Sequence, residues 1–331
     1  MKKKFNNIVI AEIGSNHNGS IGLAKKHILA AKKVGADYVK FQMHIAEEES
    51  LKDAPSPDYF KKEDRFSYFK RINFSFENWK KIKKYCEIKK IGFLCSPFSI
   101  KAVDVLERLN VELYKVPSGE LTNLPLIQRL KKTKKHIILS TGMSDYKEID
   151  QSAKILKKNF SILQCTSMYP CPISNVGLNV FKNLRKKYKC EIGYSDHTLG
   201  FSAAFAFVAN GASIIEKHFT LSKKLYGSDA KHSMEQKEFK FYVNTIKDIW
   251  IINKSFVDKN NLTAFKNMKK IFEKSVVTSE RVKKKTILKS KHLSFKKPGD
   301  GIRADMYRKV IGKKIRVELP KDTKLKYSHF Y

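Results

Sequence analysis

Eight apolar, strand-like segments alternate with amphipathic, helix-like segments through the first three-quarters of the chain. The sequence predicts strands at Ile8–Ile13, Tyr38–Gln42, Ile91–Cys95, Leu113–Val116, His136–Ser140, Ser161–Cys165, Glu191–Tyr194 and Ser213–Glu216. It predicts helices at Ile21–Val34, Glu77–Lys90, Lys101–Leu109, Leu124–Lys132, Tyr146–Lys158, Val180–Tyr188, Phe201–Ala209 and Gln236–Asn253. Eight strand–helix units in roughly 250 residues are typical of a (β/α)8 barrel. A doubly wound open sheet is the alternative, but no Gly-x-Gly-x-x-Gly pattern follows the first strand.

The alternation stops near residue 255, and short β-like runs separated by turns follow it. We therefore expect a barrel of residues 1–255, a polar, lysine-rich linker of residues 256–272, and a small β-rich domain of residues 273–331. A module this small has a marginal core, so we expect it to dock against a barrel. The connection after the second strand, about 43–76, is also unusually long. Its position at the end of a barrel strand favours an active-site rim or lid.

The formal net charge of +35 invites a nucleic-acid or membrane-surface interpretation. However, the lysines occur in pairs and triplets along predicted helix faces, and no RNP motif or zinc-finger spacing is present. This pattern favours a solvated surface that also attracts anionic substrates. The five cysteines form no Cys-x-x-Cys pair, which favours reduced thiols, with Cys95 and Cys165 in the core. We find no signal peptide and no apolar stretch long enough to span a membrane, and we expect a cytoplasmic protein.

All eight predicted strands end in polar residues, at the end of the strands where barrel active sites form. These residues are Glu12, Lys40, Gln42, Ser96, Lys115, Ser118, Ser140, Thr166, Ser167, Tyr169, Ser195, His197 and His218. One polar strand end would indicate little. Eight of them indicate a single shared site at the mouth of the barrel.

Two lysines and several serines in this set suit an anionic ligand. Lys40 and Lys115 alternate with apolar residues and are expected to point inward, where a lysine is costly unless an anion pairs with it. The alternative is that each lysine reaches out to the rim. The hydroxyls of Ser118, Ser140 and Ser195 suit phosphate oxygens, although each serine could also cap a helix.

Two histidines follow the last two predicted strands. If those strands are neighbours, His197 and His218 can share one divalent metal, with Asp196 and Glu216 orienting imidazoles or water. The alternative is a core histidine and a helix-cap histidine. Two nitrogen ligands that leave positions open for water or substrate favour Mn²⁺ or Mg²⁺ over structural zinc.

Short motifs stand in a fixed order along the chain. They are Glu12-Ile13-Gly14-Ser15-Asn16-His17-Asn18-Gly19, Lys40-Phe41-Gln42, Tyr114-Lys115-Val116-Pro117-Ser118-Gly119-Glu120, Leu139-Ser140-Thr141-Gly142-Met143, Tyr194-Ser195-Asp196-His197-Thr198 and Glu216-Lys217-His218-Phe219-Thr220. Together they resemble the sialic acid synthase (N-acetylneuraminate synthase) family over nearly the whole chain. The C-terminal part resembles the small antifreeze-like (SAF) domain, of β-clip type, that this family appends to its TIM barrel.

The resemblance implies a transferase that condenses phosphoenolpyruvate (PEP) with an open-chain N-acyl mannosamine-type sugar. The sugar would be N-acetylmannosamine or a 2,4-diacetamido-6-deoxy analogue, and the products a nine-carbon 2-keto acid and phosphate. The resemblance also implies a homodimer in which the SAF domain of one subunit covers the barrel of its partner.

Roles follow from the resemblance at matching positions. His197 and His218 would hold Mn²⁺ or Mg²⁺, which polarises the sugar aldehyde. Lys40 and Ser96 would bind the PEP carboxylate, and the phosphate would be held by Lys115, Ser118, Ser140, Ser167 and Ser195. The sugar would face Glu12, Gln42, Tyr169, Asp229 and Lys297. Glu12 is also a candidate proton-transfer group.

Two positions depart from the family pattern. Ser167 stands where neuraminate-specific bacterial members often carry Asn, and Lys297 stands where many members carry an Arg that reaches the partner's sugar. A lysine lacks the planar fork of arginine, so the sugar could differ from N-acetylmannosamine, or Arg303 could replace the family arginine. The Ser118-Gly119-Glu120 segment resembles the neuraminate and legionaminic branches more than the pseudaminic branch.

Two other functions are compatible with the sequence. A barrel aldolase would use Lys40 or Lys115 as a Schiff base with pyruvate as donor. A basic protein that binds glycan or nucleic acid through its tail would show salt-sensitive binding and no turnover. The scattered charge and the polar strand ends argue against the binding protein, and we expect neither a nucleic-acid nor a membrane partner.

Overall fold

The computed structural model describes residues 7–56 and 63–331, which divide into two compact units. The first unit comprises residues 1–255 and the second comprises residues 256–331. Each unit is described by itself below. None of the helices among the described residues combines the length and the apolar character that crossing a membrane requires.

The first unit is a closed barrel of eight parallel strands, in which each strand pairs with the next and β1 pairs with β8. The strands are β1 (Ile8–Gly14), β2 (Tyr38–Met43), β3 (Gly92–Pro97), β4 (Leu113–Val116), β5 (His136–Ser140), β6 (Phe160–Cys165), β7 (Glu191–Asp196) and β8 (Ile214–His218). The predicted (β/α)8 barrel is confirmed. Several strands run one or two residues further than the sequence predicts, so that His218 is the last residue of β8.

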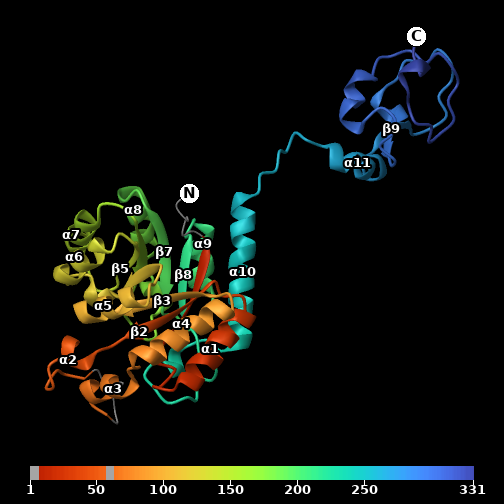
Figure 1. The fold of residues 1–331 in the computed structure, drawn as a ribbon. Helices are drawn as coiled ribbons and strands as arrows, with labels where there is room; N and C mark the ends of the chain where they lie inside the picture. The colour runs from red at the N-terminus through yellow and green to blue at the C-terminus, as the bar shows by residue number, and fades with distance from the viewer. Residues whose placement is uncertain (1–6, 57–62) are drawn as a thin grey trace. The chain divides into compact units, whose positions relative to one another are not determined.

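Helices surround the strands (Figure 1). They are α1 (Ile21–Lys33), α4 (Phe76–Ile88), α5 (Ile100–Arg108), α6 (Leu124–Lys132), α7 (Tyr146–Leu156), α8 (Leu178–Lys187), α9 (Ser202–Ala209) and α10 (Gln236–Lys254). Single-turn 3-10 helices lie at η1 (Ser118–Glu120), η2 (Ile173–Asn175) and η3 (Ala230–His232). Several of these helices begin where a polar side chain accepts a backbone N–H group, whereas α8 and α9 have no side-chain cap. Ser20 caps α1, Ser99 caps α5 and Asp145 caps α7, for example.

The interior of the barrel is built in two layers. An apolar layer holds Ile10, Tyr38, Leu94, Leu113, Ile138, Leu163 and Ile214. Because strand side chains alternate between faces, the next inward position lies two residues further along each strand. Those positions hold Glu12, Lys40, Ser96, Lys115, Ser140, Cys165 and Glu216. The apolar layer is therefore the floor on which the polar layer rests.

Gly193 of β7 occupies the remaining place in the apolar layer, two residues before Ser195. A Cβ at this position would lie 2.1 Å from the backbone oxygen of Ile214 and 2.6 Å from Leu163 Cδ2. The glycine therefore allows β7 and β8 to approach closely at the depth from which the polar residues rise.

The long connection between β2 and α4 contains two short helices, α2 (Ala46–Glu49) and α3 (Arg65–Ile72). Residues 57–62 of the predicted lid lie outside the described residues. Phe69 of α3 stacks on His44 at a centroid distance of 3.7 Å, so the described part of the connection packs onto residues that follow β2.

The second unit has its own small core of nine apolar residues. They are Val276, Val282, Leu288, Ile302, Val310, Ile315, Leu319, Leu325 and Phe330. Two antiparallel strands, β9 (Ser275–Thr278) and β10 (Leu293–Lys296), pair here, and isolated bridges join other segments. The remaining elements are η4 (Thr263–Phe265), α11 (Lys266–Phe272), η5 (Ser290–His292), η6 (Ala304–Lys309) and η7 (Tyr327–His329). The range predicted as a linker thus contains η4 and α11.

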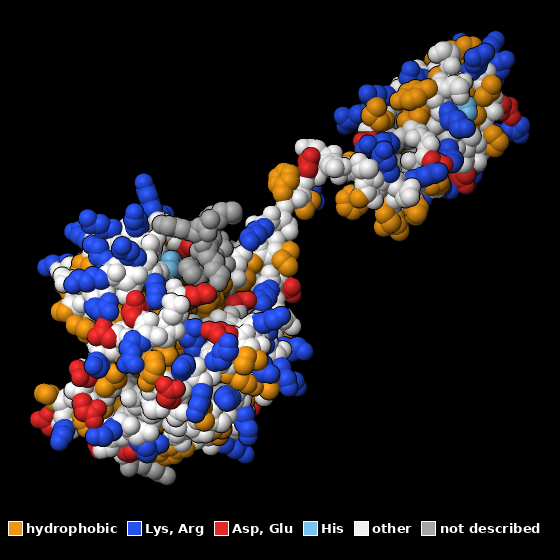
Figure 2. Space-filling model, viewed as in Figure 1, with side chains coloured by type: hydrophobic (Ala, Val, Ile, Leu, Met, Phe, Trp, Pro, Cys, Tyr) orange, Lys and Arg blue, Asp and Glu red, His pale blue; other side chains and the backbone are white. Residues whose placement is uncertain are grey.

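Basic side chains are spread over the visible face rather than gathered into one ribbon (Figure 2). Acidic and apolar side chains lie between them on the first unit. This distribution agrees with the solvated surface that the scattered lysine pairs predict.

Candidate active site

A cavity of about 350 Å³ opens at the C-terminal ends of the barrel strands. It is lined by the predicted residues Glu12, Lys40, Gln42, Lys115, Ser118, Ser140, Ser167, Tyr169, Ser195, His197, His218 and Asp229. Ser96 is fully buried behind this lining, with its Oγ 3.4 Å from Lys40 Nζ. Lys297 belongs to the second unit, where its Nζ lies over the ring of Phe272, so its contact with a partner's sugar stays a prediction.

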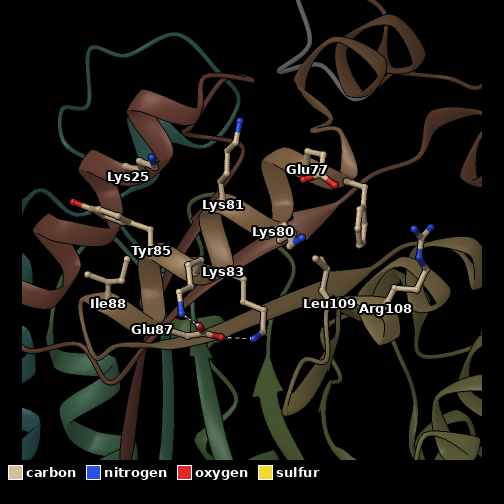
Figure 3. A pocket seen from close by; sticks show the side chains of 12 residues that line it. Lys25, Glu77, Lys80, Lys81, Lys83, Tyr85, Glu87, Ile88, Arg108 and Leu109 are labelled. Atoms are coloured by element: carbon tan, nitrogen blue, oxygen red, sulfur yellow. Dashed lines mark hydrogen bonds and ion pairs between the residues drawn. The ribbon is translucent and has the colours of Figure 1, made fainter.

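A larger cavity, about 750 Å³, lies on the outside of the barrel between α1, α4 and the end of α5 (Figure 3). Its basic side chains do not converge on one point: Lys83 and Lys84 both reach Glu87, at 2.5 and 3.5 Å, while Arg108 stands apart over Phe76. The larger volume therefore lacks the convergent polar groups of a binding site, and the smaller cavity at the mouth has them.

Two lysines and two glutamates form the floor of the mouth cavity. Lys40 Nζ lies 3.1 Å from Glu12 Oε1 and 3.3 Å from Glu216 Oε1. Lys115 Nζ lies 3.7 Å from Glu216 Oε1 and donates to Ser140 Oγ at 2.6 Å. An anionic ligand, expected as the counter-ion of these lysines, is therefore not the only one. Carboxylates from β1 and β8, far apart in the sequence, close into the same layer and serve as counter-ions.

One oxygen of each carboxylate lacks a hydrogen-bond partner within residues 7–56 and 63–331. Glu12 Oε2 and Glu216 Oε2 are buried and have no hydrogen-bond partner among the described residues. Buried polar atoms are seldom left in this state, because each unmade hydrogen bond costs about 1–3 kcal/mol. Their placement at the cavity floor marks it as a surface prepared for a polar ligand or water.

The pKa values of the two glutamates are shifted in opposite directions. Burial raises the pKa of Glu12, and the nearby Lys40 offsets this only in part, so the pKa reaches about 7. Burial also opposes the ionised form of Glu216, but Lys115 and Lys40 outweigh it and lower the pKa to about 2. Glu216 is thus a fixed anion, while Glu12 can gain or lose a proton near neutral pH.

The two lysines also differ. Burial lowers the pKa of Lys115, and Glu216 restores it only in part. Burial acts in the same direction on Lys40, but Glu12 and Glu216 outweigh it and raise the pKa above its usual value. Lys40 is therefore the more firmly held cation.

Small hydroxyl groups stand beside Lys115. Ser195 Oγ donates to Glu216 Oε1 at 3.3 Å, and Ser118 Oγ accepts from the backbone N–H of Gly142 at 3.0 Å. A Cβ on Gly142 would lie 2.4 Å from Ser167 Oγ and 2.8 Å from Ser118 Oγ. Glycine at position 142 therefore leaves the space in which Ser118 and Ser167 approach each other. Ser140 accepts a hydrogen bond from the neighbouring Lys115.

The two histidines lie side by side at the cavity wall, with ring centroids 5.6 Å apart. His197 Nδ1 donates to the Thr166 carbonyl at 2.9 Å, and its Nε2 lies 3.2 Å from the Tyr169 hydroxyl. Burial lowers the pKa of His197, but Cys165 and the Thr166 carbonyl outweigh it and raise the pKa, a shift that a bound cation would oppose. The buried Nδ1 of His218 has no hydrogen-bond partner among the described residues. Burial lowers the pKa of His218 to about 4, so its imidazole is neutral at pH 7.

These features fit a divalent metal held by two imidazoles. A metal ligand must be neutral imidazole with a free nitrogen, and a carbonyl on the other nitrogen is the usual way to fix its orientation. In the part of the chain that the structure describes, no group of three or more His, Cys, Asp or Glu side chains is arranged to bind a metal ion. A metal here would therefore leave several positions for water or substrate.

Asp229 closes the cavity on the side of β1. Its Oδ2 accepts from the backbone N–H and the hydroxyl of Ser15, both at 2.9 Å. Burial raises the pKa of Asp229, but His218 and the hydrogen bonds outweigh it and lower the pKa. A Cβ on Gly14 would lie 2.3 Å from Asp229 Oδ2, so the glycine at φ +52 leaves the space that this carboxylate fills.

Two residues lie elsewhere than the sequence predicts, and one residue of the cavity was missed. Asp196 does not orient an imidazole: it alternates with Ser195, points to the outer face of the barrel, and binds Lys217 at 3.0 Å. Cys165 is buried as expected, but it lines the cavity rather than the apolar core. His44 was missed, although it lies on the same face as Lys40 and Gln42, two residues beyond the predicted end of the strand.

Comparisons with known proteins agree on one family. The model of the NeuB family matches residues 27–276. N,N'-diacetyllegionaminic acid synthase of Campylobacter jejuni is 37% identical over 92% of this chain and 95% of its own length. The human N-acetylneuraminate-9-phosphate synthase is 32% identical over 95% of this chain and 90% of its own length. Among solved structures, the N-acetylneuraminic acid synthetase of Leptospira borgpetersenii superposes with a TM-score of 0.70 at 29% identity, covering 80% of this chain and 92% of that one.

Proposed function

The chain belongs to the NeuB family and is a transferase of the sugar-acid synthase type, and we propose that it condenses PEP with an open-chain N-acyl mannosamine-type sugar. The products are a nine-carbon 2-keto sugar acid and phosphate. The single observation that carries the proposal is the floor of the mouth cavity, where Lys40 and Lys115 stand among serine hydroxyls beside two imidazoles. A small, highly charged anion such as PEP suits this set.

PEP binds by its two charged ends. Lys40, whose Nζ is supported from behind by Ser96 Oγ, holds the carboxylate, and Lys115 with the serine hydroxyls of Ser118, Ser140, Ser167 and Ser195 holds the phosphate. Binding adds negative charge next to Glu12 and Glu216. Because the pKa of Glu12 is about 7, this carboxyl can take up a proton when PEP enters.

The reaction then needs proton movement at C2 of the donor. Carbon 3 of PEP attacks the sugar aldehyde, water adds at C2, and the C2–O bond to phosphate breaks. Glu12, whose Oε2 is free of protein partners, takes the proton from the attacking water or returns one to the leaving oxygen. Glu216 stays ionised and favours the cationic form of both lysines.

The aldehyde oxygen lies at the two histidines. His197 and His218 would hold Mn²⁺ or Mg²⁺, which when bound supplies Lewis-acid polarisation of the aldehyde. The Thr166 carbonyl fixes the ring of His197, and the Tyr169 hydroxyl and Asp229 orient sugar hydroxyls nearby.

The acceptor sugar is a 2,4-diacetamido-6-deoxy mannose-type aldehyde. The relative named N,N'-diacetyllegionaminic acid synthase in Campylobacter jejuni is 37% identical to this chain, whereas a pseudaminic acid synthase of the same species is 30% identical. Ser167, in place of the Asn common in neuraminate-specific members, also favours this sugar over N-acetylmannosamine.

The second unit acts as a SAF domain in a swapped homodimer. Its small core and turn-rich connections suit a module that gains stability by docking. In the dimer, Lys297 or Arg303 reaches the sugar of the partner subunit. Crosslinking of full-length protein to a dimer tests this directly, and a monomer with full activity would remove it.

Release of phosphate from PEP, measured with a panel of mannosamine-type sugars and with or without Mn²⁺, tests the proposal. We expect release only in the presence of a sugar, and fastest with the diacetamido sugar. No release with any sugar contradicts the proposal. A Schiff-base aldolase, for which the lowered pKa of Lys115 is the supporting feature, would instead show borohydride trapping of pyruvate on that lysine.

A matched pair of variants tests the metal. His218→Ala should abolish turnover and weaken Mn²⁺ binding. Binding is measured by electron paramagnetic resonance, in which the signal of free Mn²⁺ decreases as the ion binds to the protein. His232→Ala removes a histidine that lines the same cavity but is not assigned to the metal, and should leave Mn²⁺ binding unchanged. Equal Mn²⁺ affinity in the two variants would remove the metal assignment.

A further inference from the structure

An unbroken row of hydrogen bonds runs from the connection after β2 to the floor of the cavity. Glu49 on α2 accepts from His44 Nδ1, at 2.9 Å through Oε1 and 3.1 Å through Oε2. His44 Nε2 lies 3.0 Å from Gln42 Oε1, and Gln42 Nε2 donates to Glu12 Oε1 at 2.7 Å. Glu12 Oε1 in turn contacts Lys40. A peripheral carboxylate is thereby connected to the proton-transfer carboxyl through one imidazole and one amide.

The imidazole at the centre of this row is fixed in place. Its ring is sandwiched between Phe69 of α3, at a centroid distance of 3.7 Å, and Phe98 after β3, at 4.0 Å. The side chains of His44 and Glu49 are each 3% exposed. A surface histidine would move freely, but this one is packed on both faces and bonded at both nitrogens.

Donor and acceptor counting determines how many protons the ring carries. Nδ1 faces a carboxylate and Nε2 faces an amide oxygen, so both neighbours are acceptors. A neutral imidazole has only one N–H. Both hydrogen bonds therefore exist only if His44 is the imidazolium, which Glu49 neutralises.

The amide of Gln42 transmits this charge to Glu12. With its oxygen held by His44, the amide points its N–H at Glu12, a bond that favours the ionised carboxylate. If the amide turns over, its N–H faces His44 Nε2 and its oxygen faces Glu12. In this second orientation the contacts are satisfied only if His44 Nε2 has lost its proton and Glu12 Oε1 carries one. The two orientations therefore hold the same number of protons, on His44 in the first and on Glu12 in the second.

We propose that His44 and Glu49 are positioning residues that set the protonation of Glu12 through the orientation of the Gln42 amide. The proposal rests on the proposed role of Glu12 as the proton-transfer group. It assigns a function to α2 and α3: when Glu49 and Phe69 are packed in place, the imidazolium holds the amide in the orientation that keeps Glu12 ready to accept a proton.

Other charged groups face the row and are held constant in the test. Glu12 faces Lys40, Glu216 and Asp229, from β2, β8 and the segment after β8. The far end faces His17 after β1, and Glu120 of η1 lies within electrostatic range of Glu49. None of these groups is altered by the variants below.

The test compares two glutamates of the same short helix. Glu49→Gln keeps the shape of the side chain but removes the charge that neutralises the imidazolium, and Glu48→Gln removes a charge from the exposed face of α2. His44→Phe keeps the packing between Phe69 and Phe98 without either hydrogen bond. Glu49→Gln and His44→Phe should move the limb of the pH profile of kcat/KM that belongs to Glu12 upward by about one pH unit, because a bond to its ionised form is lost.

The limb of the kcat/KM profile that belongs to Glu12 moves to higher pH whether the reaction uses the ionised or the protonated form of Glu12. Glu48→Gln should leave the profile of the parent enzyme in place. A limb that stays unmoved in both Glu49→Gln and His44→Phe overturns the proposal, because a merely structural loss would lower the rate without moving the profile.

A second measurement does not depend on turnover, and it separates this proposal from the proposed function. In ¹⁵N spectra of imidazole nitrogens at pH 7, the signals that vanish in His44→Phe belong to His44. Both nitrogens should carry protons in the parent protein, and one should lose its proton in Glu49→Gln. A singly protonated His44 in the parent protein overturns the proposal even if PEP condensation is found, and an imidazolium supports it even if no sugar is accepted.

Discussion

Two buried charge clusters lie on opposite faces of the barrel wall at β8. Facing inward, Glu216 joins Lys40, Lys115 and Glu12 at the cavity floor. Facing outward, Asp196 joins Lys217, which is its direct register partner on the neighbouring strand. Strand β8 therefore carries a charged residue to each side of the barrel wall, Glu216 to the inner side and Lys217 to the outer side, because strand side chains alternate between faces.

The outward cluster is fully satisfied. Asp196 Oδ1 accepts from the backbone N–H of Thr198 at 2.9 Å and from its hydroxyl at 2.8 Å. Asp196 Oδ2 accepts from Tyr242 of α10 at 3.1 Å and from Lys217, which also donates to the Thr198 carbonyl. No atom of these four residues is among the buried polar atoms that lack a partner in the described chain.

The inward cluster is left incomplete, with one free oxygen on each glutamate. Both clusters are buried, so burial alone does not separate a structural network from a site. The difference is that the inward cluster has hydrogen-bond acceptors without a partner, which a ligand can use, whereas the outward cluster, as far as the chain is described, has none. The expected consequence is a division of labour between activity and stability.

The largest expected effect is the loss of activity in Lys115→Met. This change removes a donor to Ser140 and, under the proposed function, the cation that faces the PEP phosphate. We expect PEP-dependent phosphate release to fall by on the order of a thousandfold. Unfolding in urea should change little, because Glu216 keeps Lys40 as its partner. Normal turnover in this variant would contradict the assignment of the inward cluster to activity.

The outer cluster should respond in the opposite way to the same chemical change. Lys217→Met leaves the Asp196 carboxylate buried without a cation, and we expect a loss of about 3–5 kcal/mol in the free energy of unfolding. Lys217→Met combined with Asp196→Asn should recover part of it, since the uncompensated charge is then gone. Denaturant unfolding of both variants measures this, and equal stability of the single and double variants would show that the outer pair is not a coupled unit.

The stability of the inward cluster should depend on pH through Glu12. Its pKa is raised from 4.5 to about 7, so its contribution to stability is complete below about pH 4.5 and is lost as the pH rises through 7. Glu216 acts oppositely: its pKa is lowered to about 2, and its contribution is lost only as the pH falls from 4.5 to 2. In Glu12→Gln the loss between pH 4.5 and 7, up to about 3 kcal/mol, should disappear. The free energy of unfolding measured across this range checks the sign, and an unchanged slope would contradict it.

Much of the inward cluster could be predicted from the sequence. The strand period places Lys40 and Lys115 inward, and the order of the strands brings His197 and His218 together. Glu12 meets Lys40 as its register partner on the neighbouring strand β1, but Glu216 approaches the lysines only when β8 closes the barrel against β1, which could not be predicted.

The residues that sequence reasoning misassigned lie at strand ends. The sequence predicts that the seventh strand ends at Tyr194, but β7 continues to Asp196 and turns that residue outward. The second strand, predicted to end at Gln42, continues to Met43, and His44 keeps its alternation. Strand ends depend on pairing with neighbouring strands, which composition and periodicity do not encode.

The smallest expected effect belongs to Tyr242→Phe, which removes one hydrogen bond from the outer cluster and no packing volume. Asp196 keeps Lys217 and Thr198, so the carboxylate stays paired. We expect a loss of about 1 kcal/mol in the free energy of unfolding and no change in the rate of phosphate release. Because Asp196 and Lys217 each precede a histidine of the cavity, an activity change larger than the stability change would show that the outer cluster also aligns His197 and His218. The two faces of the wall would then work as one unit, and the division between activity and stability would have to be given up.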